Sequence, residues 1–363
     1  MVSLGAAAPH PALSPPGRGE EFTAISHTMP LTHILARAIS AIVTLLGVMV
    51  IVFVLVRVVP GDPVAMMIAP GASDADILAL RAHYGLDLSV WRQFLVWFGQ
   101  VLQGNFGTSI SLKQNVLTII LGRLPATLEL AAFALCLAVL WGTFIALVST
   151  AWRGTLVERF IDNFNGVMLA VPDFIWGLTF VLLLGVLVPI LPISGRSDPS
   201  IDARLSTQFY VIEGLLRGHL QFVWDVLKHM IMPALTMSFP LAAVIGRVLK
   251  NAMMEVMVQD YILLAHIKGL SNLRILLQEA LRNAAVPALA LTGVQFTFLI
   301  GGTVITERIF SYPGIGNLAI DAVINRDLPL IQGLVLTFGT IFIAVNMVVD
   351  AMTAWLNPRL RHA

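Results

Sequence analysis

The sequence contains few charged residues. Asp, Glu, Lys and Arg together make up 12% of its 363 residues, against about 25% in an ordinary soluble domain. Hydrophobic residues make up 57% of the chain, and the mean hydropathy is +0.86. So few polar side chains could not cover a water-soluble globule of this length, which disfavours a soluble enzyme and a disordered chain. The composition predicts an integral membrane protein.

The sequence also lacks residues that several kinds of site require. Cys136 is the single cysteine, so an internal disulfide is excluded and a thiolate metal site would have no second cysteine. The eight histidines show no H-E-x-x-H spacing, and we expect no metal site and no catalytic site. The 22 basic and 21 acidic residues give a net charge of +1, which provides no general attraction to nucleic acid.

Uncharged segments divide the chain into six candidate membrane spans. About 20 apolar residues in a helix cross the hydrocarbon core of a bilayer. The candidate spans are 38–56, 130–152, 174–195, 229–246, 283–306 and 328–349. We therefore expect an all-α membrane protein with about six transmembrane helices and both termini on one side. The distribution of Lys and Arg favours cytoplasmic termini only slightly.

These spans imply four regions. Residues 1–30 are rich in Pro, Gly and Ala, and we expect a disordered extension or a start site assigned too early, with Met29 as the first residue of the mature chain. Residues 31–57 are expected to form the first transmembrane helix. Residues 58–125 are expected to form a long extracytoplasmic loop, and residues 126–361 a core of five helices.

The long loop has helical patterns of its own. Residues 74–84 are typical of a short helix that Asp74 caps and Gly85 ends. Residues 91–103 place most of their aromatic side chains on one helical face. Such aromatic, amphipathic segments lie at the membrane interface, so the loop is expected to carry interfacial helices.

The segment 251–283, between the fourth and fifth spans, also has a distinctive pattern. Asp260 and Tyr261 begin a short apolar helix, and Gly269 is expected to end it in a left-handed conformation. Ser271 can then cap a second helix. A compact apolar corner on a charged loop suits a groove on another protein. A helix that rests on lipid headgroups is the alternative interpretation.

Several blocks resemble one family of membrane proteins. Residues 260–287, DYILLAHIKGLSNLRILLQEALRNAAVP, resemble the cytoplasmic loop with which bacterial ABC-importer permeases dock on their ATPase. Further blocks agree, including VVPGDP (58–63), RLPATLEL (123–130) and ERIFSYPGIGNLAIDAVINRDLPLIQG (307–333). Together the blocks resemble the dipeptide, oligopeptide and nickel permease family, first-subunit type. His266 stands where Arg is usual in that family.

The resemblance implies a permease subunit that forms half of a pathway for peptides or related small solutes, such as nickel chelates or glutathione. The partners implied are a second homologous permease subunit, two cytoplasmic ATPase subunits, an extracytoplasmic solute-binding protein and membrane lipid. The ATPases would use ATP and Mg²⁺, and this chain would bind no cofactor. It would be a multi-pass protein of the inner cell membrane with cytoplasmic termini and would not itself be an enzyme.

Two sets of residues follow as functional candidates. The ATPase-docking loop comprises Asp260, Tyr261, Leu264, Ala265, His266, Lys268, Gly269 and Leu270. A gate loop over the extracytoplasmic mouth of the pathway comprises Glu307, Pro313, Gly314, Gly316 and Asp321. The spacing of the two glycines imitates a dinucleotide-binding fingerprint, but a membrane span precedes it where that fingerprint needs a strand.

An ion-coupled secondary transporter is the alternative function. It would need a coupling-ion site near the midplane and usually internal repeats, and neither is evident. Glu129, Asp173 and Asp350 lie at or inside span ends, where both a structural role and proton coupling are open. Glu129 is expected in the first turn of its helix, where the helix dipole favours a negative charge. Pro172 and Pro240 are expected to interrupt the third and fourth spans.

Overall fold

The computed structural model describes residues 31–58, 87–201 and 205–356, and regular structure there is helical apart from one isolated β-bridge. Within these ranges, five helices are long: α1 (Leu31–Val58), α5 (Val116–Ala151), α9 (Leu220–Val256), α12 (Leu281–Ile309) and α14 (Leu328–Leu356). The shorter elements are α4 (Val90–Leu102), α6 (Leu156–Ala170), α7 (Asp173–Phe180), α8 (Tyr210–Leu216), α10 (Asp260–Ile267), α11 (Asn272–Arg274), α13 (Ile315–Ile324) and the π-helical segments η1 (Val181–Leu187) and η2 (Ile275–Ala280). The predictions for residues 1–30 and 74–84 lie outside the described residues.

The long helices have the length and polarity of membrane spans. Within the described ranges, four segments could cross a bilayer, or five if α6 and α7 count as one broken span. The four are Val116–Ala151, Leu220–Val256, Asn272–Ile309 and Leu328–Ala351. The apolar segment Ile39–Val54 of α1 is shorter. The all-α membrane class is thereby confirmed, while six crossings stay a prediction.

The third predicted span differs most from the structure. The prediction was one helix over 174–195, but helical structure ends at Leu187 and the following residues are irregular. At its other end, α7 meets α6 at a bend of 103°. Val171 is extended there because the ring of Pro172 disfavours a helical conformation for the residue before it. The expected interruption at Pro172 is thus confirmed, whereas Pro240 stays within α9.

Helix α5 begins within the predicted 58–125 loop. The side chain of Asn115 accepts hydrogen bonds from the backbone N–H groups of the next turn, at 2.9 and 3.3 Å, and so caps a helix that starts at Val116. Pro125 lies inside this helix. Glu129 is therefore more than three turns from the helix start, and the prediction that it occupies the first turn is wrong. Asn115 is a stronger start signal than Pro125, because proline is tolerated inside a helix that neighbouring helices support.

Helices α5 and α9 form the centre of the molecule. They approach closely at two glycines: a Cβ on Gly142 would lie 2.9 Å from the carbonyl oxygen of Ala242, and a Cβ on Gly246 would lie 3.1 Å from the carbonyl oxygen of Gly142. Small residues let two membrane helices bring their backbones together in this way. The surrounding buried residues are mostly alanine, methionine and leucine from the same two helices.

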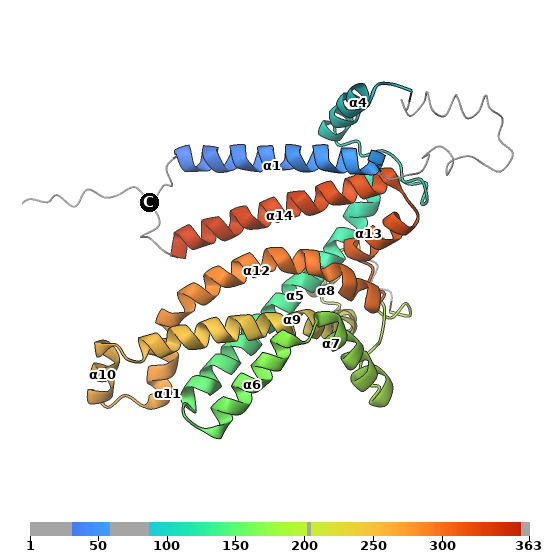
Figure 1. The fold of residues 1–363 in the computed structure, drawn as a ribbon. Helices are drawn as coiled ribbons and strands as arrows, with labels where there is room; N and C mark the ends of the chain where they lie inside the picture. The colour runs from blue at the N-terminus through green and yellow to red at the C-terminus, as the bar shows by residue number, and fades with distance from the viewer. Residues whose placement is uncertain (1–30, 59–86, 202–204, 357–363) are drawn as a thin grey trace, which may run out of the picture.

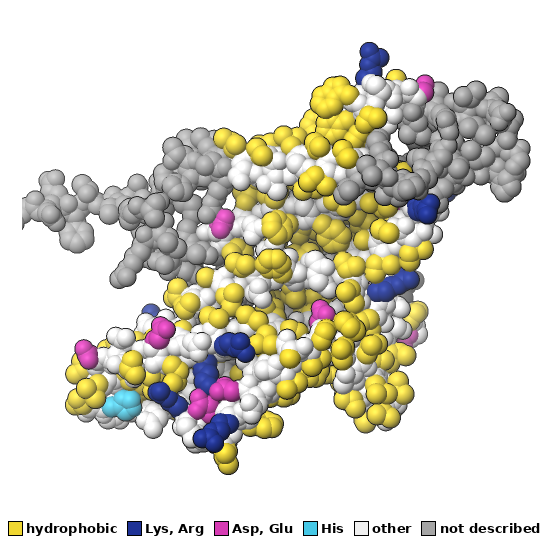
Figure 2. Space-filling model, in the orientation of Figure 1, with side chains coloured by type: hydrophobic (Ala, Val, Ile, Leu, Met, Phe, Trp, Pro, Cys, Tyr) yellow, Lys and Arg dark blue, Asp and Glu magenta, His cyan; other side chains and the backbone are white. Residues whose placement is uncertain are grey.

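The long helices lie side by side, and the short ones gather at their two ends (Figure 1). Helices α10 and α11 lie at the end where α1 begins and α14 finishes, and α4, α8 and α13 lie at the opposite end. On the face drawn in Figure 2, a broad hydrophobic band separates charged groups at the two ends. The largest group of charges lies toward the end with α10 and α11. This distribution is what a bilayer-spanning protein requires.

The aromatic helix predicted over 91–103 is present as α4. One of its faces packs on α1, where the ring of Phe53 lies 5.1 Å from that of Phe94 and 5.6 Å from that of Trp97. Trp91 and Leu95 are exposed. The predicted helix is confirmed, and its apolar exposed face is compatible with the interfacial position expected for it.

Candidate functional site

The predicted docking loop forms a compact corner. Helix α10 ends at Ile267, and Gly269, just after the cap residue Lys268, has a φ of +77°, which confirms the left-handed conformation predicted from the sequence. The N–H of Gly269 donates to the carbonyl of His266, and the N–H of Leu270 donates to the carbonyl of Ala265. These two bonds form a Schellman motif. The side chain of Ser271 accepts from a backbone N–H of α11 and caps it, as predicted.

Two small cores fix this corner to α9. Ile262 and Ala265 of α10 pack against Ile275, which begins η2. The next residue, Leu276, packs against Leu249 and Met253 near the end of α9. Ala265, a predicted docking residue, is therefore buried inside the corner, and its side chain is not available to a partner.

The outer side of the corner is apolar and exposed. Tyr261, Leu264 and Ile267 are 39%, 54% and 72% exposed. We define the corner surface as the exposed large hydrophobic residues of α10, α11 and η2: Tyr261, Leu263, Leu264, Ile267, Leu273 and Leu277. Of the other predicted docking residues, Asp260, His266 and Lys268 are also exposed. A surface that combines apolar and charged side chains on a rigid projection suits protein recognition.

The predicted gate loop is organised by Glu307. Its side chain is fully buried, and its carboxylate lies at the start of α13, where it accepts from the N–H of Asn317 at 2.8 Å. The hydroxyl of Thr127, on α5, donates to the same carboxylate at 2.7 Å and accepts from the N–H of Ile315 at 2.9 Å. Glu307 thus supplies hydrogen-bond acceptors to backbone N–H groups that the start of α13 leaves without an intrahelical partner.

The two glycines of this loop make room for that carboxylate. A Cβ on Gly314 would overlap the Glu307 carboxylate, and a Cβ on Gly316 would lie 2.7 Å from Cα of Val304. A side-chain carboxylate of the chain itself thus occupies the position that a phosphate would take at the helix start. Asp321, by contrast, lies on the exposed side of α13 and pairs with Arg308 at 2.9 Å.

Pro313 joins this loop to a buried tyrosine. Its neighbour Tyr312 is fully buried, and the pKa of the Tyr312 phenol is raised by burial. The backbone N–H of Tyr312 donates to the carbonyl of Glu307 at 2.8 Å, so the chain folds back on the end of α12. The structure therefore brings Glu307, Pro313, Gly314 and Gly316 together and leaves Asp321 on the surface.

Other carboxylates bind backbone amides at the same end of the molecule. The carboxylate of Glu129 accepts from Arg196 Nη2 at 2.8 Å and from the N–H of Val211 at 2.9 Å, and both charged side chains are buried. Asp327 accepts from the hydroxyl of Ser109 at 2.5 Å and from the N–H of Ser111 at 2.9 Å. Burial alone would raise the pKa of Asp327, but these hydrogen bonds outweigh burial and lower it.

Glu213 completes this group. Its carboxylate accepts from the hydroxyl of Thr207 and from the backbone N–H groups of Ser206 and Thr207, at 2.7 and 2.6 Å. The Thr207 hydroxyl is the main reason that the pKa of Glu213 falls to about 2. We name Glu129, Glu213, Glu307 and Asp327 the carboxylate rim. Each of these four side chains binds a backbone amide, which is a structural role.

The remaining acidic candidates lie elsewhere. The carboxylate of Asp173 accepts from the N–H of Phe174 at 2.8 Å in the first turn of α7. Asp350 lies on α14, about two turns before the helix ends. Within the described part of the chain, no group of three His, Cys, Asp or Glu side chains is arranged to hold a metal ion.

Sequence reasoning missed Thr127 and Arg196. Thr127 gives no sequence signal, because a threonine in an apolar helix usually bonds to its own backbone. Arg196 does give one, since a single arginine that follows a long apolar segment needs an acidic partner if it is buried. That signal does not say which carboxylate the partner is.

Comparison with known proteins adds a consistent pattern. The sequence model of the family described as "Binding-protein-dependent transport system inner membrane component" matches residues 116–362, and the model of its N-terminal part matches residues 30–131. The chain is similar to the di/tripeptide transport system permease protein DppB of Pseudomonas aeruginosa, with 37% identity over 92% of this chain and 99% of the relative. It is also similar to the dipeptide transport system permease protein DppB of Escherichia coli and to the glutathione transport system permease protein GsiC of Salmonella paratyphi A. Each is 34% identical over 92% of this chain and 99% of the relative.

Proposed function

Because the chain belongs to the family of binding-protein-dependent inner membrane transport components, we propose that it helps to form a pathway for short peptides. It is a multi-pass transport subunit and not itself an enzyme, and it works with a solute-binding protein and an ATPase. Di- and tripeptides are the proposed solutes because the relatives are named for them, and glutathione is a related candidate. An ion-coupled secondary transporter is not favoured, since these relatives are permeases of transport systems.

The proposed assembly contains this chain, a second homologous permease, two ATPase subunits that use ATP and Mg²⁺, and one solute-binding protein. We propose six crossings, with α1, the α6–α7 pair and the four longer segments each crossing once. An even number places both termini on one side. Their proposed cytoplasmic position is supported by Figure 1, where α1 begins and α14 finishes at the end that carries α10 and α11.

The corner surface is the observation that carries the docking proposal. Its exposed leucine and isoleucine side chains project on a short helix that two small cores hold rigidly against α9. A rigid apolar projection of this kind can transmit a push from a partner, whereas a flexible loop would absorb it. The carboxylate rim and the gate loop then lie at the opposite, extracytoplasmic end, beneath the proposed position of the binding protein.

The test compares two glycines with the same backbone conformation. Gly269 and Gly104 have φ of +77° and +76°, and no other atoms crowd either one. Gly269→Pro, which proline's fixed negative φ makes incompatible with the corner, should abolish co-purification of the ATPase and ATP-dependent dipeptide uptake. Gly104→Pro, at the opposite end of the molecule, should leave co-purification intact. Uptake that survives Gly269→Pro, or that runs on a proton gradient without ATP, would contradict the proposal.

A further inference from the structure

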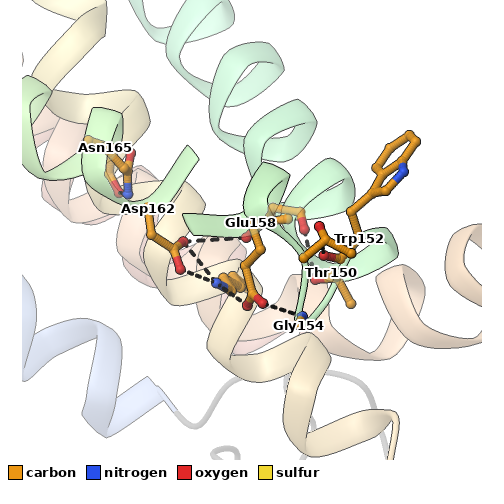
Figure 3. A network of polar contacts seen from close by, with 11 residues as sticks. Thr150, Trp152, Gly154, Glu158, Asp162 and Asn165 are labelled. Atoms are coloured by element: carbon orange, nitrogen blue, oxygen red, sulfur yellow. Dashed lines mark hydrogen bonds and ion pairs between the residues drawn. The ribbon is translucent and has the colours of Figure 1, made fainter. Parts of the chain in front are cut away.

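Lys250 links two helices near the docking loop. It lies on α9, and its Nζ is 2.8 Å from the carboxylate of Glu158 and 2.7 Å from that of Asp162, both on α6 (Figure 3). Asp162 also accepts from the hydroxyl of Ser149 on α5 at 3.3 Å. Glu158 accepts from the N–H of Gly154, in the turn between α5 and α6, at 2.6 Å. One ammonium group therefore ties the start of α6 to α9.

Helix α6 points Glu158 and Asp162 toward Lys250 of α9, although the Asp162 side chain stays about half exposed. Its opposite side carries Phe160 and Phe164, whose rings stack 6.5 Å apart and are exposed in this chain. The Lys250–Asp162 pair is screened by water because the Asp162 side chain is 49% exposed, whereas the Lys250–Glu158 pair, with side chains 15% and 18% exposed, is screened less.

The docking loop is anchored to the same stretch of α9. Leu249 and Met253, on either side of Lys250 in the sequence, are buried against Leu276 and Ala280 of η2. Any displacement of the corner therefore reaches α9 at the turn that carries Lys250. Packed side chains and ion pairs of this kind form a continuous physical connection between two elements.

The far end of the α6–α7 pair also rests on α9. Beyond the bend, the rings of Trp176 and Phe180 lie 5.2 and 5.1 Å from the ring of Phe239. Just before the bend, the side chain of Asn165 donates to the carbonyl of Ala243 at 3.0 Å. Helix α9 thus holds the broken helix pair on both sides of its bend, and Lys250 holds the start of α6 to the same helix.

We propose that Lys250 is a positioning residue for energy coupling, which makes α6 follow α9 when the docking loop moves. Its ion pairs with Glu158 and Asp162 would carry the motion to the α6–α7 bend, so that this broken helix shifts together with the centre of the molecule. The inference rests on the proposed docking of an ATPase at residues 251–283. Lys228, near the other end of α9, provides a matched control because its ammonium lies over the ring of Trp224 on the same helix.

The test measures dipeptide transported per ATP hydrolysed by the complete transporter in proteoliposomes. Lys250→Met should keep the ATPase bound and its basal hydrolysis unchanged but lower the transport ratio about ten-fold. Lys250→Arg should retain most of the ratio, and Lys228→Met should retain all of it. A purely structural role would instead lower the amount of assembled complex and leave the ratio of the remainder unchanged, which would overturn the proposal.

A cross-linking experiment decides the case if Lys250→Met fails to assemble. With Cys136→Ser as background, Asp162→Cys and Lys250→Cys are combined and joined by a short bifunctional thiol reagent. If α6 must follow α9, the cross-link should restore the transport ratio that the unlinked double variant lacks. A cross-link that blocks transport would mean that the helices separate during the cycle, and the proposal would be wrong. If the unmodified chain does not bind the ATPase, docking itself fails, and that result is distinguishable from a failure of Lys250.

Discussion

Replacing Thr127 with valine tests whether the buried carboxylate organises the gate loop. The Thr127 hydroxyl donates to Glu307 at 2.7 Å and accepts from the N–H of Ile315 at 2.9 Å, so it joins α5, α12 and α13 at one point. Thr127→Val keeps the size and branching of the side chain and removes both bonds. The change in stability therefore reports the hydrogen bonds and not a cavity.

The expected cost follows from burial. Thr127 and Glu307 are both fully buried, so water cannot replace the lost partners without opening the loop. An unsatisfied buried polar group costs about 1–3 kcal/mol. Thr127→Val removes the hydroxyl that binds two such groups, the Glu307 carboxylate and the N–H of Ile315. The N–H of Asn317 still binds the other carboxylate oxygen, so we expect a total loss of about 2–5 kcal/mol.

The assay is thermal unfolding of the purified protein in lipid nanodiscs, with Thr150→Val as the matched control. Thr150 lies on the same helix and is buried, but its hydroxyl binds only the carbonyl of Ala146 one turn earlier, at 2.7 Å. We expect Thr127→Val to lower the apparent melting temperature by about 5 °C or more. Thr150→Val should change the melting temperature by about 1 °C, because losing the Thr150 hydroxyl leaves no buried donor unpaired. Equal effects of the two substitutions would refute the reasoning about Glu307.

Two further predictions concern other parts of the structure. Gly142→Ala should separate α5 from α9 and lower the melting temperature, because its Cβ would lie 2.9 Å from a backbone carbonyl oxygen of α9. Gly122→Ala on the same helix meets open space and should leave the melting temperature unchanged or raise it. Equal effects of the two substitutions would contradict the close contact. Glu213 has its pKa lowered from 4.5 to about 2, so it contributes stability above about pH 4.5 that is lost as the pH falls toward 2. The melting temperatures of the unmodified chain and of Glu213→Gln should therefore converge as the pH falls from about 4.5 to about 2, and a constant difference would show that ionisation is not responsible.

Local features of the molecule were predictable from the sequence. The glycine at 269 could be placed in a left-handed cap because the conformation depends on one residue and its immediate neighbours. The helix over 91–103 and the interruption at Pro172 were predictable for the same reason, since periodicity and proline act over a few residues.

Features that depend on distant pairs were not predictable. Thr127 and Glu307 are 180 residues apart in the sequence, and Glu129 and Arg196 are 67 apart, so no local pattern matches the partners. The span over 174–195 was wrong in its extent because the absence of charge measures how long a segment stays apolar. It does not measure where the backbone leaves the helix, and Pro189 and Pro192 allow an apolar segment to continue without helical structure.

The carboxylate rim has a consequence for how the protein is made. A ribosome delivers Thr127 long before Glu307, and Ser109 precedes Asp327 by 218 residues. The side chains of Thr127 and Ser109 therefore stay without their partners, in water or in the insertion machinery, until nearly the whole chain has been synthesised. The rim can close only after α13 has emerged, so a truncated chain would expose unpaired polar groups at this end, a state that membrane quality control can recognise.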